Sequence, residues 1–270
     1  MVELARRNVL SALAVSPWAV SPWAVSPFAG VPLAAILADP KLARAAAAGV
    51  EEVTLATRGG RSVRGALALP EVSPAPAVLL VHEWWGLNDQ IKTMAAEFAR
   101  EGYVALAVDL YGGKVAETPE DARTYMQAVD AGAATDTLVS WTAWLRDHPK
   151  ATGRLGTVGW CFGGGWSLNA SIAAPVDATV VYYGRVDQPA EELAKLQGPV
   201  LGHFASRDQW INEQMVGGFV ERMEGLNKPV TVYWYEADHA FANPTGARYD
   251  AADAKLAWQR TLAFYAEHLR

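Results

Sequence analysis

The one cysteine of this 270-residue chain stands where a nucleophile could act. Cys161 lies in the segment Gly159-Trp-Cys161-Phe-Gly-Gly-Gly165, between an apolar run at residues 155–159 and an apolar helical pattern at residues 166–173. The small residues allow a tight turn from a strand into a helix, and the free N–H groups of a helix N-terminus favour a thiolate. We interpret Cys161 as a candidate nucleophile; the alternative is a small hydrophobic residue of the core.

A thiol nucleophile needs a base and a group that orients the base. Asp208 follows an apolar run at residues 200–205, and His239 follows another at residues 230–235. The order nucleophile, acid, histidine along the chain suits a catalytic triad. The alternatives are that Asp208 is a turn residue or a helix N-cap and that His239 is a surface histidine.

Among the other histidines, only His82 competes for the role of base. It ends an apolar run, whereas His148, His203 and His268 fall in a polar loop, inside a strand and near the terminus. Glu83 comes next, at the end of the same expected strand. A carboxylate there could hold the Cys161 thiol or take its proton. The alternative is a structural carboxylate in a salt bridge.

From about residue 51, strand and helix patterns alternate along the chain. Strands are expected at residues 53–57, 63–69, 77–82, 103–109, 155–159, 178–183, 200–205 and 230–235, and helices at 89–101, 118–147, 166–173, 213–224 and 250–269. The first two strands are expected to pair antiparallel. The rest predict an α/β fold, a mainly parallel sheet covered by helices on both faces. Ligands of such sheets bind at the carboxyl ends of the strands, where the candidate residues fall.

Composition narrows the function further. Hydrophobic residues make up 51% and charged residues 19%, as in an ordered globular protein. A net charge of -6 without a basic block argues against a nucleic-acid partner. One cysteine excludes an intrachain disulfide and a zinc site built from several cysteines. Four tryptophans beside the motifs favour either a pocket for a flat substrate or core packing: Trp84, Trp85, Trp160 and Trp166.

Residues 1–48 differ from the rest and are expected to form an extension of the domain at residues 49–270. Arg6-Arg7 precedes an apolar, Ala-rich segment that repeats Ser-Pro-Trp-Ala-Val from residues 16 and 21. Prolines at positions 17, 22, 27 and 32 argue against a continuous transmembrane helix, so no stable membrane insertion is expected. The extension resembles a twin-arginine export signal, which predicts a periplasmic protein; the alternative is a cytoplasmic protein with an N-terminal arm.

The chain resembles the dienelactone hydrolase family from about residue 50 to residue 270. The segments that carry the resemblance are Val81-His-Glu83-Trp-Trp-Gly-Leu-Asn-Asp89, Val108-Asp-Leu-Tyr-Gly112, Gly159-Trp-Cys161-Phe-Gly-Gly164, Tyr182-Tyr-Gly184, Gly202-His-Phe-Ala-Ser-Arg-Asp208 and His239-Ala-Phe241. The resemblance implies an α/β-hydrolase fold and a triad of Cys161, Asp208 and His239. It further implies that Glu83 activates the thiol when substrate binds. The backbone N–H groups of Trp84 and Phe162 would form the oxyanion hole.

The chain departs from that family at two arginines, which hold the substrate's carboxylate in the dienelactone enzymes. Here Gly112-Gly113-Lys114 stands in place of one and Asn243 in place of the other. Lys114, Arg185 or Arg248 could substitute for them, but a dienelactone is not the substrate that the sequence favours. The candidate pocket residues are Trp85, Tyr111, Lys114, Trp160, Tyr183, Arg185, Phe241 and Asn243.

The leading hypothesis is a hydrolase that cleaves a small-molecule ester or lactone without a metal or a cofactor. The alternatives are a non-catalytic small-molecule-binding protein on the same fold and a thiol-based redox sensor. The full set of triad residues weighs against the first alternative, and the lack of a second, resolving cysteine weighs against the other. The chain is expected to be a monomer or a small homo-oligomer.

Overall fold

The computed structural model describes residues 35–36, 39–47 and 49–270. The paired arginines at positions 6 and 7 and the proline-containing repeat lie outside these residues, so the export signal stays a prediction. None of the helices in the described part of the chain is both long and apolar enough to cross a membrane.

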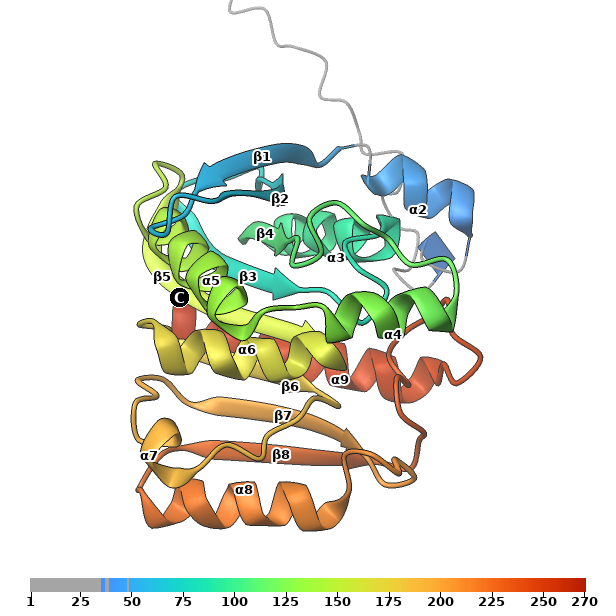
Figure 1. The fold of residues 1–270 in the computed structure, drawn as a ribbon, viewed down its shortest axis with the longest axis vertical. Coiled ribbons are helices and arrows are strands. Elements are labelled where there is room, and N and C mark those ends of the chain that lie inside the picture. The colour runs from blue at the N-terminus through green and yellow to red at the C-terminus, as the bar shows by residue number, and fades with distance from the viewer. Residues whose placement is uncertain (1–34, 37–38, 48) are drawn as a thin grey trace, which may run out of the picture. The chain divides into compact units, whose positions relative to one another are not determined.

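The described residues form a sheet of eight strands in the order β1-β2-β4-β3-β5-β6-β7-β8 (Figure 1). The strands are β1 (Glu51–Ala56), β2 (Ser62–Ala68), β3 (Ala75–Val81), β4 (Val104–Val108), β5 (Ala151–Trp160), β6 (Ala178–Tyr182), β7 (Val200–Ala205) and β8 (Val230–Tyr235). The pairings β1–β2 and β2–β4 are antiparallel, and all five others are parallel. The predicted α/β fold with a mainly parallel sheet is confirmed.

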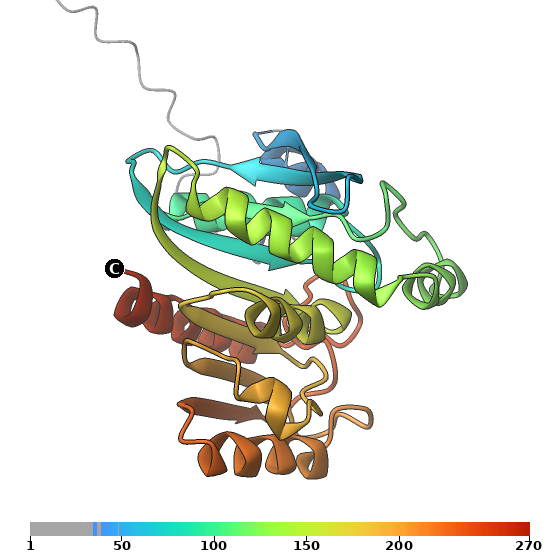
Figure 2. The same ribbon diagram turned by 60° about the vertical axis from the view of Figure 1, so that its left-hand side comes forward.

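Helices cover both faces of the sheet (Figure 2). One face packs against α3 (Asp89–Arg100) and α9 (Ala251–Leu269), and the other against α5 (Ala131–Arg146), α6 (Phe162–Ala173) and α8 (Glu213–Gly225). Neighbouring strand residues divide between the two cores: Val78 and Leu80 belong to the first, Leu79 to the second. Side chains alternate across a strand, so an unbroken apolar strand serves both cores at once.

Some elements differ from the sequence expectation. Strand β5 starts four residues early, because Ala151 still pairs with Ala75 of β3, ahead of a shift of register before Leu155. The expected helix at 118–147 is two helices, α4 (Pro119–Gln127) and α5, and the Asp130 carboxylate caps the second by accepting from the Ala133 N–H. The four-residue helix α7 (Ala190–Leu193) is too short to leave a periodic pattern in the sequence.

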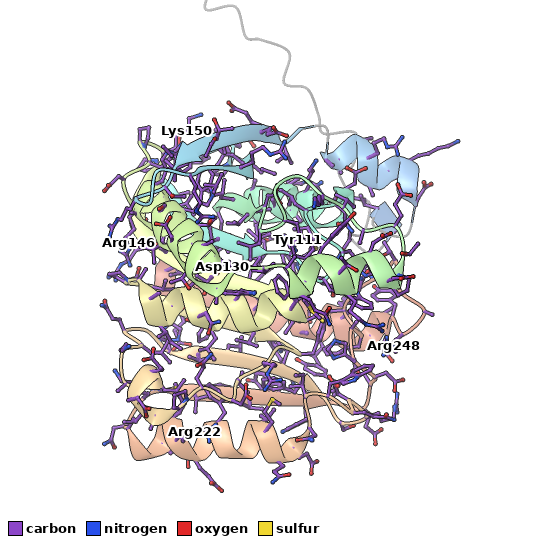
Figure 3. All side chains as sticks on the ribbon, in the orientation of Figure 1. Tyr111, Asp130, Arg146, Lys150, Arg222 and Arg248 are labelled. Carbon is purple, nitrogen blue, oxygen red and sulfur yellow. The ribbon has the colours of Figure 1, made fainter. Side chains whose placement is uncertain are left out.

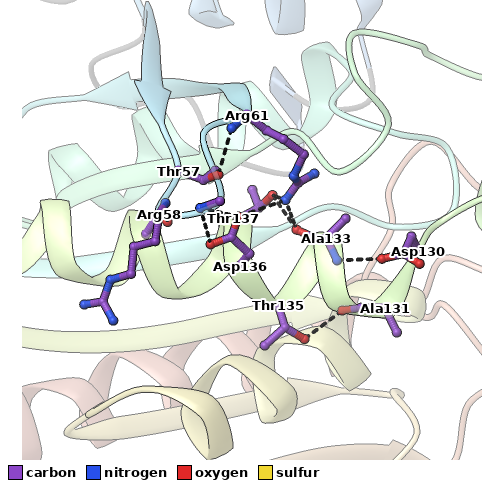
Figure 4. Close-up of polar contacts among 11 residues, drawn as sticks. Thr57, Arg58, Arg61, Asp130, Ala131, Ala133, Thr135, Asp136 and Thr137 are labelled. Atoms are coloured by element: carbon purple, nitrogen blue, oxygen red, sulfur yellow. Dashed lines mark hydrogen bonds and ion pairs between the residues drawn. The ribbon is translucent and has the colours of Figure 1, made fainter.

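The turn between β1 and β2 is tied to α5 by polar contacts, which hold the antiparallel edge of the sheet in place (Figure 4). The Arg61 guanidinium donates to the Ala133 carbonyl and to the Thr137 hydroxyl, the latter at 3.2 Å. The same guanidinium pairs with Asp136 at 3.3 Å. These contacts join segments more than 70 positions apart in the chain.

One helix of the N-terminal region, α2 (Pro40–Ala47), packs against α3. Its residues Ala43, Ala46 and Ala47 are buried, and the Thr93 hydroxyl of α3 donates to the Ala43 carbonyl at 2.9 Å. Arg44 and Asp89 form an exposed ion pair at 3.6 Å. For residues 40–47 this packing favours the interpretation as an arm that rests on the domain.

Candidate active site

Cys161 lies in a strained turn between β5 and α6. Its φ is 54° and its ψ is −117°, a backbone conformation that residues other than glycine rarely adopt. Gly159 and Gly163 let α6 pack closely there: a Cβ at Gly159 would lie 1.9 Å from the Gly163 carbonyl oxygen, and one at Gly163 would lie 2.2 Å from the Val81 carbonyl oxygen. The close packing of α6 therefore requires glycine at positions 159 and 163. The turn places the Cys161 side chain at the carboxyl end of β5.

A continuous chain of contacts runs from the thiol to a carboxylate. His239 Nε2 lies 3.1 Å from Cys161 Sγ, and His239 Nδ1 lies 2.5 Å from Asp208 Oδ2. The other oxygen of Asp208 accepts the N–H groups of Trp210 at 2.9 Å and Ile211 at 3.1 Å. The three side chains come from loops that follow β5, β7 and β8, so the parallel sheet brings them to one edge. Such a chain can move a proton from the thiol to the imidazole and hold the imidazolium that forms.

The electrostatics of the site disfavour a free thiolate at Cys161. Burial, and then the negative charge of Glu83, raise the pKa of the Cys161 thiol to about 12, although the Phe162 N–H opposes them. The resting thiol is therefore protonated at neutral pH. Burial would also raise the pKa of Asp208, but the hydrogen bond and charge of His239 outweigh it and lower that pKa, which keeps Asp208 ionised opposite the imidazole.

His82 does not compete for the role of base. It is completely buried, its Nδ1 lies 2.6 Å from the Glu83 carbonyl oxygen, and its Nε2 accepts the Leu110 N–H at 3.2 Å. Because both ring nitrogens bond to the backbone, neither is left to take a proton from Cys161. Burial lowers the pKa of His82, which is consistent with a neutral structural imidazole.

Glu83 is a buried carboxylate held by two neutral donors. Its side chain accepts the Tyr183 hydroxyl at 3.3 Å and the Asn243 amide at 2.5 Å. None of the ion pairs recorded for the described residues includes Glu83, so the salt-bridge alternative has no partner there. Burial raises its pKa, and the Asn243 hydrogen bond opposes that rise. Its charge reaches Cys161, whose pKa it raises further.

The two N–H groups expected in the oxyanion hole follow adjacent strands. Phe162 is the first residue of α6, so its N–H has no acceptor within the helix. Trp84 lies in the turn after β3, which pairs with β5. This turn is closed by the bond from the Gly86 N–H to the Glu83 carbonyl at 3.2 Å.

The other pocket candidates divide into three groups. Tyr183 and Asn243 reach Glu83, as described, while Trp85 packs on Trp84 with ring centroids 5.0 Å apart, and Tyr111 lies 5.7 Å from the Phe162 ring. Trp160 packs in the core 5.6 Å from Tyr182, and Phe241 is completely buried behind Tyr183, with ring centroids 5.4 Å apart. The exposed Arg185 pairs with Asp187.

Lys114 points toward a different hollow. Its ammonium lies 5.2 Å from the Tyr125 ring centroid, and with Tyr111 it lines a hollow of about 520 Å³ between the β1–β2 edge and α4 and α5. The residues that line this hollow include neither Cys161 nor His239. Figure 3 labels Tyr111, in the loop after β4, and Arg248, in the loop ahead of α9.

Sequence reasoning missed one side chain at this site, that of Trp210. Its ring centroid lies 5.2 Å from that of His239, with the two planes at 81°. The only local signal is its place two residues after Asp208. Among the described residues, no group of three or more His, Cys, Asp and Glu side chains is arranged to hold a metal ion.

Comparison with known proteins agrees with this geometry. Residues 63–269 match the profile described as "Dienelactone hydrolase family". A carboxymethylenebutenolidase of Pseudomonas putida is 28% identical over 231 residues, which cover 80% of this chain and 96% of that protein. Protein usf of Aquifex pyrophilus is 33% identical over 230 residues, which cover 78% of this chain and 96% of that protein. A Klebsiella pneumoniae crystal structure assigned to the dienelactone hydrolases superposes with a TM-score of 0.74 at 26% identity, over 81% of this chain and 98% of that one. With its covered, mainly parallel sheet and a match to the family profile over residues 63–269, the chain belongs to the dienelactone hydrolase family.

Proposed function

We propose that this family member hydrolyses a small-molecule ester or lactone with Cys161 as nucleophile, His239 as base and Asp208 as the group that orients the base. The observation that carries the proposal is the unbroken contact from Cys161 Sγ through the imidazole to the Asp208 carboxylate. It is supported by the family's hydrolases, which include enzymes named carboxymethylenebutenolidase.

In the first half-reaction, His239 Nε2 takes the thiol proton while Sγ bonds to the carbonyl carbon of the substrate. The carbonyl oxygen becomes an oxyanion, which the N–H groups of Trp84 and Phe162 would stabilise. The carbon–oxygen bond to the alcohol then breaks, and His239 gives its proton to the departing oxygen. The acyl group remains on Cys161 as a thioester.

In the second half-reaction, water attacks the thioester and His239 takes the proton of the water. The carbon–sulfur bond breaks, the thiol regains its proton, and a carboxylic acid leaves. For a lactone, the alcohol of the first step stays joined to the acyl group, so both steps yield one hydroxy acid. Neither half-reaction needs an external oxidant, reductant or metal.

The Glu83→Gln variant should separate the effect of this carboxylate on the thiol from its effect on the fold. Removing the charge removes a cause of the raised pKa of Cys161, so alkylation by iodoacetamide at pH 8 should become faster, on the order of tenfold. Turnover of an ester should fall, because the resemblance to the dienelactone hydrolases implies that Glu83 activates the thiol once substrate is bound. Glu221→Gln, an exposed position on α8, is the matched control. Unchanged alkylation and turnover would mean that Glu83 does not act on Cys161.

Substrate charge should matter as well. A lactone that bears a carboxylate should be hydrolysed less efficiently than its neutral carboxamide, because Asn243 is committed to Glu83 and Arg185 to Asp187. A bidentate arginine contact is hard to replace, so kcat/KM should differ by about tenfold or more. The two compounds are compared at fixed ionic strength. A higher kcat/KM for the carboxylate would assign the lost arginine role to Arg248, whose charge acts on Cys161.

The two alternative functions predict different results with the same protein. A binding protein would bind a lactone without releasing acid, and a redox sensor would lose its free thiol to mild peroxide without any ester hydrolysis. Titration of Cys161 with iodoacetamide beside an ester assay distinguishes them, because only a Cys-dependent hydrolase loses activity in proportion to the thiol that is blocked.

A further inference from the structure

Trp210 combines exposure with contact to the proposed base. The side chain is 61% exposed, although its ring lies 5.2 Å from the His239 ring. Its backbone N–H donates to Asp208, so the loop that carries the ring is tied to the carboxylate that orients His239. The indole is thus held in place through its backbone while its surface stays open to solvent.

The other aromatic ring against His239 cannot offer such a surface. Tyr183 lies 5.2 Å from the imidazole, but it is 1% exposed, and its hydroxyl is used by Glu83. Of these two rings, only the indole of Trp210 can meet a ligand that arrives from solvent.

A cation stands next to the exposed indole. The guanidinium carbon of Arg248 lies 5.5 Å from the Trp210 ring centroid, within the range of a cation–π contact. None of the ion pairs recorded for the described residues includes Arg248. Burial and Glu83 raise the pKa of Cys161, and the charge of Arg248 is among the effects that oppose them. The guanidinium therefore acts within electrostatic range of the thiol.

The chemistry of the reaction says which part of a substrate meets this surface. His239 must return its proton to the departing oxygen, so the alcohol part of the ester has to lie beside the imidazole. Of the surfaces in contact with His239, the open one is the indole. A flat aromatic group has the shape and apolar character to pack on it. The oxygen of a phenol carries negative charge as its bond to the acyl carbon breaks, before His239 protonates it, and the positive charge of Arg248 stands beside the ring that would hold it.

We propose that Trp210 is a specificity-determining residue that packs against the alcohol part of the substrate, with Arg248 beside it, so that the preferred substrates are esters whose alcohol part carries an aromatic ring. The proposal rests on the proposed function, because it takes His239 as the group that protonates the departing oxygen. It adds which residue selects that part of the substrate and what chemical class it selects.

Three acetates test it: phenyl, benzyl and ethyl acetate. For Trp210→Ala, kcat/KM for the phenyl and benzyl esters should fall on the order of tenfold, the value of burying one ring face, while the ethyl ester changes less than about twofold. Trp210→Phe should recover most of the loss, because it restores a flat ring. Arg248→Gln should lower kcat/KM more for the phenyl ester than for the benzyl ester, since a phenolic oxygen carries more negative charge as it departs, before His239 protonates it.

The control is Trp234→Ala, which removes another partly exposed tryptophan, 38% exposed on β8 and packed on Phe204. This variant should have the same kcat/KM as the unsubstituted protein for each of the three acetates. The alkylation rate of Cys161 with iodoacetamide should also be the same in Trp210→Ala, which would show that the thiol and its base are still assembled.

An equal loss on all three acetates in both Trp210 variants would overturn the proposal and leave Trp210 with a purely structural role. No loss on any of them would overturn it too. These results are distinct from failure of the proposed function itself. In that case, iodoacetamide would block Cys161 in the unsubstituted protein and leave hydrolysis of all three acetates intact.

Discussion

Replacing Cys161 with alanine should lower kcat/KM for esters and lactones by a factor on the order of 10³ or more. The variant keeps the Cβ and loses only the atom that would attack the carbonyl carbon. His239 and Asp208 keep their own contact, so the site should stay assembled. The measurement is initial-rate hydrolysis of the best acetate or lactone found in a substrate screen.

A melting curve is the control for this variant, and its midpoint should stay within a few degrees of the original. The variant loses the hydrogen bond between the thiol and His239, and the strained backbone of the turn should be unchanged. If most activity survived, Cys161 would not be the nucleophile, and a binding function for this fold would become the better account.

His239→Ala should be almost as damaging as the loss of the cysteine. The burial and Glu83 charge that raise the pKa of Cys161 to about 12 leave almost no thiolate at neutral pH without a base. The double variant Cys161→Ala with His239→Ala should be little worse than either single variant, because groups that act as a unit lose their effect together. Steady-state rates of the three variants on one ester make the comparison.

His148→Ala is a suitable control. This histidine packs on Trp144 ahead of the first residue of β5, whereas Cys161 follows the last residue of the same strand. The variant should leave the rate unchanged. Near-additive losses in the double variant would argue that Cys161 and His239 do not serve the same step. A mild effect of His239→Ala together with a large effect of His82→Ala on rate, at unchanged stability, would reassign the base.

Local chemistry made the elbow predictable. The residues around Cys161 predict a tight turn from strand to helix. The glycines at positions 159 and 163 stand where any Cβ would clash with backbone atoms. Asp208 and His239 could be placed because parallel strands end at one edge of the sheet, so residues after β7 and β8 must come near residues after β5. Both inferences use only apolar runs and chain order.

Contacts between side chains of distant loops could not be predicted from the sequence. The donors to Glu83 lie 100 and 160 positions away, and no periodic pattern relates them to it. The contact of Trp210 with His239 depends on the conformations of two loops after neighbouring strands, which hydrophobic spacing does not encode. The same limit applies to Trp160 and Phe241, whose aromatic character fits a pocket or a core equally well and which the fold uses in the core.

The packing of α2 on α3 bears on how the chain can be shortened after synthesis. Ile36 and three alanines of α2 are buried, and the hydroxyl of Thr93 takes its acceptor from the α2 backbone. A peptidase that cut ahead of residue 35 would keep Ile36 and the described contacts between α2 and α3 in the processed chain. A cut after Ala47 would uncover apolar surface on α3, the helix that follows the Trp84–Trp85 turn, so a stable processed form should begin ahead of α2.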